Sequence, residues 1–313
     1  VISQQIFDFG QQLTACRYWD ALKRRANWLA ECSRAAGRWT QVVPWDRMGY
    51  LNLTNTSYII AFARRYRMER PDRFRGPDAC RCGFCARAGG VRRFDGDHDE
   101  SDCMKRGWNK TLVHHTIVDA LVRMLKHCGG FVEGSIKSEY KYWDPARVGT
   151  DGTRRVPDVT CTDKQGKEYV IDARIFWNAM SESSNGFMAY TDTGVGAVRG
   201  EAEKRRSWDA AMLRRAEAAP AGVEFIPFSL EASGVWGPAA RRFFAKCLYL
   251  ADDDRDIDVY HWSSAKFSST WHDTFSILLA RGRAQVSVAA SRGDWPKRTQ
   301  DQAYSDQNHA SAA

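Results

Sequence analysis

Two aspartates, Asp158 and Asp172, lie in a stretch that is typical of a β-hairpin, residues 154–176. A polar turn around Gly166 separates two short runs rich in Val, Ile, Tyr and Phe. If the hairpin is symmetric about Gln165, opposed residues have numbers that sum to 330, and Asp158 faces Asp172. Opposed side chains lie roughly 4.5–5.5 Å apart at Cβ, where two carboxylates repel unless a cation, usually Mg²⁺, lies between them. The spacing therefore predicts a metal site, with an ordinary charged hairpin surface as the alternative.

The alternation of side chains along the hairpin supports this pairing. Apolar residues share one face: Val159, Cys161, Tyr169, Ile171, Ala173 and Ile175. Polar residues share the other face: Asp158, Thr160, Asp172 and Arg174. The two carboxylates are thus expected on the same polar face.

A second group of candidate metal ligands lies in a Gly- and Asp-rich segment, residues 80–103. It offers five side chains where zinc takes four: Cys80, Cys82, Cys85, His98 and Cys103. The spacing of His98 and Cys103 resembles the second half of a CCHC knuckle, and either Cys80 with Cys82 or Cys82 with Cys85 supplies the first half. Closely spaced cysteines often bind metal, and this segment has little core of its own. We predict a zinc knuckle; free thiols in a loop are the alternative.

Composition and charge narrow the class of protein. The chain has 313 residues, a net charge of +8 and a pI of about 9.0, and arginine, which suits phosphate contacts, supplies much of the excess. No apolar run of membrane-spanning length occurs, and the first residues lack the pattern of a signal peptide. The cysteine usage indicates a reducing compartment, nuclear or cytosolic. Because the chain begins at Val1, we expect it to be a piece of a longer protein.

The elements that must position these residues follow from hydrophobic periodicity. A helix is predicted over 109–130, with a buried stripe of Val113, Ile117, Leu121, Leu125 and Cys128. An edge strand within 131–153 leads to the hairpin, residues 177–200 are predicted to be a surface loop, and a helix follows over 201–219. A proline-containing strand over 224–230 precedes a helix over 238–250 that buries Phe243, Phe244, Cys247 and Leu248. This order predicts an α/β fold with a mixed sheet flanked by helices.

The flanking regions are predicted from composition. A helix around residues 58–67 should be capped by Thr54, Asn55 or Thr56. The expected organisation is a helical N-terminal and linker region (1–75), a zinc knuckle (76–108), the α/β domain (109–250), a C-terminal helical extension (251–286) and a disordered tail (287–313).

Taken in order, these motifs resemble a known family, the restriction-endonuclease-like domain of site-specific non-LTR retrotransposon proteins. This domain is a branch of the PD-(D/E)xK nuclease superfamily. The likeness covers roughly residues 45–250, and no polymerase signature is present. The residues that carry it are Cys80, Cys82, His98, Cys103, His115, Pro157, Asp158, Asp172, Arg174, Lys204 and residues 225–228.

The resemblance implies Mg²⁺-dependent DNA cleavage that leaves a nick with a 3′ hydroxyl able to prime reverse transcription. Asp158 and Asp172 match the acidic pair that holds the metal, and Glu139 is a candidate third acidic ligand. Arg174 stands where the family has its motif lysine, and arginine cannot act as a base. Lys204 on the following helix fits the place of the working lysine, whereas Ser207 stands where a second basic residue is expected.

The resulting predictions can be stated by role. The catalytic residues are Asp158, Asp172, Arg174, Lys204 and His115, and Arg154, Arg155, Arg205 and Arg206 contact nucleic acid. The expected cofactors are Mg²⁺ and structural Zn²⁺. The partners are DNA, with RNA as a second candidate, and a larger polyprotein or reverse transcriptase chain, but no membrane. The location is nuclear, with cytoplasmic transit.

Two alternatives remain open. The first is a catalytically inactive nuclease-like protein that binds nucleic acid; Arg174 and Ser207 are the residues that favour it. The second is an unrelated zinc-stabilised α/β interaction protein, which is indicated if Asp158 and Asp172 lie more than about 8 Å apart.

Overall fold

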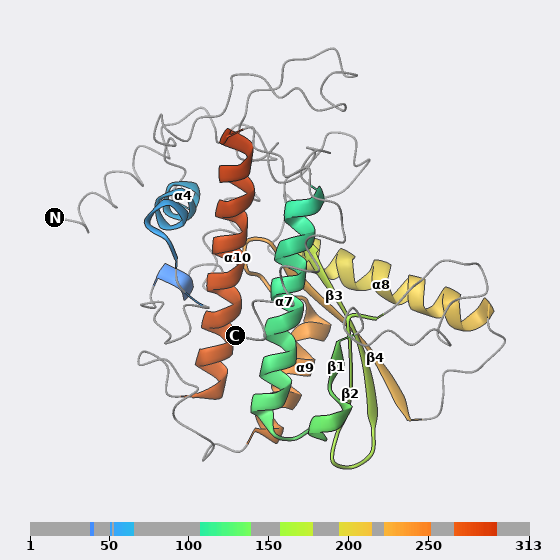
Figure 1. Cartoon of the computed structure of the whole chain (residues 1–313). Coiled ribbons are helices and arrows are strands. Elements are labelled where there is room, and N and C mark those ends of the chain that lie inside the picture. Colours follow the sequence, from blue (N-terminus) through green and yellow to red (C-terminus); the bar gives the residue numbers. More distant parts are fainter. Residues whose placement is uncertain are drawn as a thin grey trace.

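The computed structural model describes residues 38–40, 51, 53–65, 107–138, 157–177, 194–214, 222–251 and 266–292. The elements in chain order are η2 (Arg38–Thr40), α4 (Asn55–Arg65), α7 (Gly107–Cys128), η5 (Glu133–Ser135), β1 (Lys137–Ser138), β2 (Val159–Thr162), β3 (Glu168–Phe176), α8 (Val195–Arg214), β4 (Val223–Glu231), α9 (Pro238–Leu250) and α10 (Phe267–Arg292). They form a four-stranded mixed sheet flanked by helices (Figure 1), which confirms the predicted α/β class. The predicted zinc knuckle lies outside these residues.

The sheet has the strand order β1-β2-β3-β4. Strands β2 and β3 form the predicted antiparallel hairpin, with Val159 opposite Ile171 and Cys161 opposite Tyr169, so each pair of numbers sums to 330. Gly166 in the turn has φ +87°, a conformation that favours glycine. Strand β4 pairs with β3 in parallel and lies at an edge of the described sheet, as its proline predicted.

The two faces of the hairpin meet different helices. The predicted apolar face is buried against α7 and α9, and Tyr169 packs on Phe243 of α9 with ring centroids 5.9 Å apart. The other face meets α8, which connects β3 to β4; Trp208 of α8 stacks on Phe225 of β4 with centroids 4.6 Å apart. Arg174 on this face reaches Glu203 of α8. Two polar residues of the hairpin, Asp172 and Arg174, therefore lie under α8.

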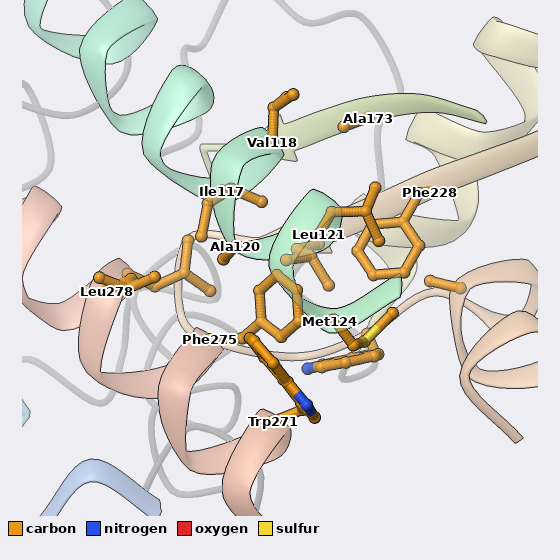
Figure 2. Close-up of a cluster of buried hydrophobic side chains, with 14 of the residues drawn as sticks. Ile117, Val118, Ala120, Leu121, Met124, Ala173, Phe228, Trp271, Phe275 and Leu278 are labelled. Carbon is orange, nitrogen blue, oxygen red and sulfur yellow. The ribbon is translucent and has the colours of Figure 1, made fainter. Parts of the chain in front are cut away.

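The long helix α10 lies beside α7 and packs on α4 as well (Figure 1). Figure 2 shows Phe275 and Leu278 of α10 among Ile117, Leu121 and Met124 of α7. The two helices approach closely where Gly282 meets Val113, because a Cβ on Gly282 would lie only 2.6 Å from a methyl group of Val113. The predicted α7 stripe is buried throughout.

Residues near the N-terminus are tied to α10. Arg38 Nε forms an ion pair with Asp273 Oδ1 at 2.5 Å, and the backbone N–H of Trp39 donates to Ser276 Oγ at 3.1 Å. Helix α4 begins at Asn55, and Thr54 caps it by accepting a hydrogen bond from the Ser57 N–H at 3.1 Å. One of the three predicted capping residues is thus identified.

Two predicted element boundaries and one predicted burial are wrong. Helix α8 begins at Val195, inside the segment predicted to be a loop over 177–200. Helix α10 continues to Arg292, beyond the predicted start of a disordered tail at 287. Leu248 of α9 is 41% exposed rather than buried, because the helix turns only its Phe243, Phe244 and Cys247 side into the core.

None of the helices in the described ranges has the length and apolar character needed to cross a membrane.

Candidate functional site

Asp172 and Lys204 meet between β3 and α8. Asp172 lies near the middle of β3, and Lys204 Nζ donates to Asp172 Oδ1 at 2.5 Å. Helix α8 can pass this close to the sheet because Gly200 faces Ser229 of β4; a Cβ at that glycine would lie 2.3 Å from the Ser229 hydroxyl. The start of α8 is held by Glu231 of β4, which accepts the Gly196 N–H at 3.0 Å. Local packing therefore places Lys204 over the acidic pair.

Asp158 directly precedes β2 and is held by the neighbouring strand. The backbone N–H of Ala173 donates to Asp158 Oδ2 at 2.7 Å. Since Ala173 follows Asp172 in β3, this bond orients the Asp158 carboxylate beside Asp172. The charge of Asp158 raises the pKa of Asp172, so the hairpin brings the predicted pair together.

A histidine from α7 completes the contacts of Asp158. His114 Nε2 lies 3.3 Å from Asp158 Oδ2 and 3.2 Å from the Ala173 carbonyl oxygen. The sequence nominates His115 as a catalytic residue; the histidine seen on Asp158 is its neighbour His114. The signal for His114 is its helical phase, since it lies one turn before the buried residues Ile117 and Val118.

The pKa values of the two carboxylates are shifted in opposite directions. Burial raises the pKa of Asp172 to about 6; the Lys204 ammonium opposes this, and the charge of Asp158 adds to it. Burial acts in the same direction on Asp158, but the hydrogen bond and charge of His114, the charge of Lys204 and the Ala173 N–H together outweigh it and lower the pKa of Asp158. Burial opposes the charging of His114, yet the contact with Asp158 raises the pKa of this imidazole. The site therefore contains two opposed pairs, Asp158 with His114 and Asp172 with Lys204.

Arg174 binds a carboxylate outside the aspartate pair, that of Glu203 on α8. Its Nη1 lies 2.6 Å from Glu203 Oε2, and Arg199 Nε lies 2.8 Å from the other oxygen, Glu203 Oε1. The predicted nucleic-acid contacts Arg205 and Arg206 are exposed on α8. The remaining predicted site residues lie outside the described residues: Cys80, Cys82, Cys85, His98, Cys103, Glu139, Arg154 and Arg155.

The donor set fits a hard divalent cation. Mg²⁺ is commonly bound through one or two carboxylates together with waters and substrate phosphates, and two adjacent carboxylates are present here. Within the ranges that the structure describes, no group of three His, Cys, Asp or Glu side chains forms a metal site. Asp158 and Asp172 would therefore hold the ion with oxygens from water and substrate.

The chain was also compared with known proteins, and neither a protein-family model nor a curated protein matches it. The assignment of a function rests on the residues and the geometry of the site.

Proposed function

We propose that this chain is the metal-dependent endonuclease part of a retrotransposon-type protein and that it nicks DNA to leave a 3′ hydroxyl primer. The observation that carries the proposal is the meeting of Asp158, Asp172 and Lys204 at one point. The hairpin spacing nominates the two aspartates independently, and the resemblance to the nuclease family nominates Lys204. A lysine delivered from the helix after the motif strand replaces the one that Arg174 cannot supply.

Each residue has a role in this proposal. Asp158 and Asp172 hold Mg²⁺, which when bound lowers the pKa of water and offsets charge that develops on the phosphate. Lys204, whose ammonium reaches Asp172 at 2.5 Å, orients the attacking water and stabilises negative charge beside it. His114 and the Ala173 N–H hold the Asp158 carboxylate in one orientation. The remainder of the proposal is a CCHC zinc knuckle, DNA as partner with RNA as a second nucleic acid, a larger reverse transcriptase chain and a nuclear location.

Nicking of supercoiled plasmid tests the proposal. The wild type should convert plasmid to open circles with Mg²⁺ and stop in EDTA, and Asp158→Asn, Asp172→Asn and Lys204→Met should each reduce the rate at least about a hundredfold. Asp209→Asn is the matched control, because Asp209 is an exposed aspartate on α8, the helix that carries Lys204. The nick should be extended by a DNA polymerase, as a 3′ hydroxyl requires. Nicking that survives Asp172→Asn overturns the proposed site.

Two observations favour a second candidate, a catalytically inactive protein of the same fold that binds nucleic acid. The cations that would serve catalysis are both engaged, Lys204 by Asp172 and Arg174 by Glu203. In addition, the described residues offer two carboxylates rather than three metal ligands in one group. DNA binding without Mg²⁺-dependent nicking in the same preparation would establish this candidate.

A further inference from the structure

Two arginines from different elements converge on one glutamate beside the candidate site. Arg174 lies on β3, two residues after Asp172, and Arg199 lies one turn before Glu203 on α8. The two oxygens of Glu203 are divided between the guanidinium groups, at 2.6 Å from Arg174 and 2.8 Å from Arg199. The Glu203 carboxylate is thus held between two arginines, where another anion could take its place.

The arginine from the strand is held in place rather than free to swing. A Cβ at Gly200 would lie 3.3 Å from Cδ of Arg174, so the absence of a side chain there lets the arginine stem pass over the helix backbone. The guanidinium of Arg174 also lies 5.9 Å from the centre of the Phe176 ring. An arginine fixed in this way loses little entropy when it binds an anion.

All three side chains are accessible to solvent. The exposed fractions are 34% for Arg174, 27% for Glu203 and 42% for Arg199. Exposed ion pairs contribute little to stability, so displacing Glu203 from the two arginines requires little free energy. A phosphodiester presents two non-bridging oxygens, the same pair of acceptors that the carboxylate presents, and guanidinium groups bind both anions in the same bidentate manner.

We propose that Arg174 and Arg199 form a clamp for a backbone phosphate of DNA next to the one cleaved, and that Glu203 occupies the clamp until the nucleic acid displaces it. Arg174 and Asp172 are separated by two strand residues, about 6.6 to 6.8 Å, so the clamp lies directly beside the acidic pair. This inference rests on the proposed function for its ligand, but it concerns binding rather than cleavage.

Fluorescence anisotropy with a labelled DNA duplex, in buffer without Mg²⁺ or chelator, measures binding separately from cleavage and leaves the proposed structural zinc in place. Arg199→Ala should lose roughly tenfold in affinity, because a charge-assisted contact is removed. The slope of log K against log salt should fall in magnitude by about one phosphate contact. Glu203→Gln keeps the shape but removes the competing charge, so it should bind about threefold more tightly than the wild type. Arg123→Ala, an exposed arginine on α7, is the matched control and should leave the slope unchanged.

The clamp is overturned if Arg199→Ala behaves like Arg123→Ala, or if Glu203→Gln binds no more tightly than the wild type. These outcomes are separable from failure of the proposed function. If Arg199→Ala weakens binding and Glu203→Gln strengthens it in a protein that does not nick plasmid, the clamp is supported and the cleavage proposal is contradicted. Intact nicking with no effect of Arg199→Ala sinks the clamp alone.

Discussion

Asp158 and Asp172 are residues of the same type on the two arms of the hairpin, but they have different partners. Asp158 is contacted by His114 and receives the Ala173 N–H, which together lower its pKa. Asp172 has Lys204 and the nearby negative charge of Asp158, and burial raises its pKa to about 6. A metal bound between the two would offset the burial, and the repulsion by Asp158, that raise the pKa of Asp172.

Replacing Asp172 by asparagine tests this raised pKa. Because the pKa in the folded protein exceeds the ordinary value of 3.8, the native state keeps a proton that the unfolded chain has released. Stability therefore falls as the pH rises from about 4 to about 6. In urea denaturation with EDTA, the free energy of unfolding of Asp172→Asn relative to the wild type should rise by about 2 kcal/mol across that window.

Above this window the difference in unfolding free energy between Asp172→Asn and the wild type should change little with pH. Asp209→Asn, which changes an exposed aspartate, serves as the control and should show no such trend. If the difference instead falls across the window, the ion pair with Lys204 outweighs the cost of burial and the raised pKa is refuted.

The two adjacent histidines should respond to pH in opposite directions. The pKa of His114 is raised, so its stabilising contribution is full below the unfolded value of 6.5 and is lost as the pH rises through the folded pKa. Burial, together with the charge of His114, lowers the pKa of His115, which costs stability at low pH. His114→Ala should lose about 1–2 kcal/mol of unfolding free energy at about pH 5.5 and less at about pH 8.

His115→Ala provides the comparison. The free energy of unfolding of His115→Ala, relative to that of the wild type, should be higher at about pH 5.5 than at about pH 8, the reverse of the trend for His114→Ala. Urea denaturation in EDTA at the two pH values measures both. Parallel trends in the two variants would contradict the placement of His114, rather than His115, on Asp158.

At the residue scale, sequence reasoning succeeded where spacing alone determines geometry. The aspartate pair follows from hairpin symmetry, which fixes facing residues by counting. Choosing between His114 and His115 requires the rotation of α7 about its axis, and one residue changes the direction of a side chain by about 100°. The partner of Arg174 could not be predicted, because Glu203 lies on an element whose packing is long-range.

At the scale of elements, the hairpin and α8 show the same contrast. The hairpin was predicted with its register because its turn and alternation are local signals. The sequence predicts a loop for the first turns of α8 because Gly196 and Gly200 lower helix propensity. Both glycines are required by tertiary contacts: Cβ atoms at Gly196 and Gly200 would collide with Phe176 and Ser229.

Gly200→Ala separates propensity from packing. Helix propensity alone would stabilise α8 by about 1 kcal/mol. The added methyl group would lie 2.3 Å from Ser229 Oγ, however, so we expect a net loss of about 1–3 kcal/mol in urea denaturation and a reduced nicking rate as Lys204 shifts. Gly134→Ala is the control, because its Cβ would meet nothing within 4 Å.

A second substitution should rescue the first. Ser229 Oγ is buried and makes no hydrogen bond with the described residues, so Ser229→Ala should cost little by itself. Combined with Gly200→Ala, it removes the atom that the new methyl group meets. If the double variant is no more stable than Gly200→Ala, steric contact with Ser229 is not the cause of the loss.

At the scale of the whole molecule, one core joins elements that the sequence assigned to separate regions. Trp39 and Leu51 from the N-terminal region, Leu121 from the α/β domain and Leu278 from the predicted extension belong to a single buried cluster. The resemblance to nuclease domains stops at about residue 250, and nothing local in α10 reveals that it packs along α7. Long-range helix packing of this kind depends on the whole fold rather than on any one segment.

Ending the chain after Ala251 tests whether α10 belongs to this core. Because Phe275 and Leu278 are almost fully buried against α7 (Figure 2), the shortened chain should lose cooperative unfolding and its near-ultraviolet circular dichroism. The point variant Leu278→Ala should lower the free energy of unfolding by about 2–5 kcal/mol, whereas Ser269→Ala near the start of α10 should stay within about 0.5 kcal/mol. A shortened chain that unfolds cooperatively at the wild-type midpoint would show that α10 is the separate extension that the sequence predicted.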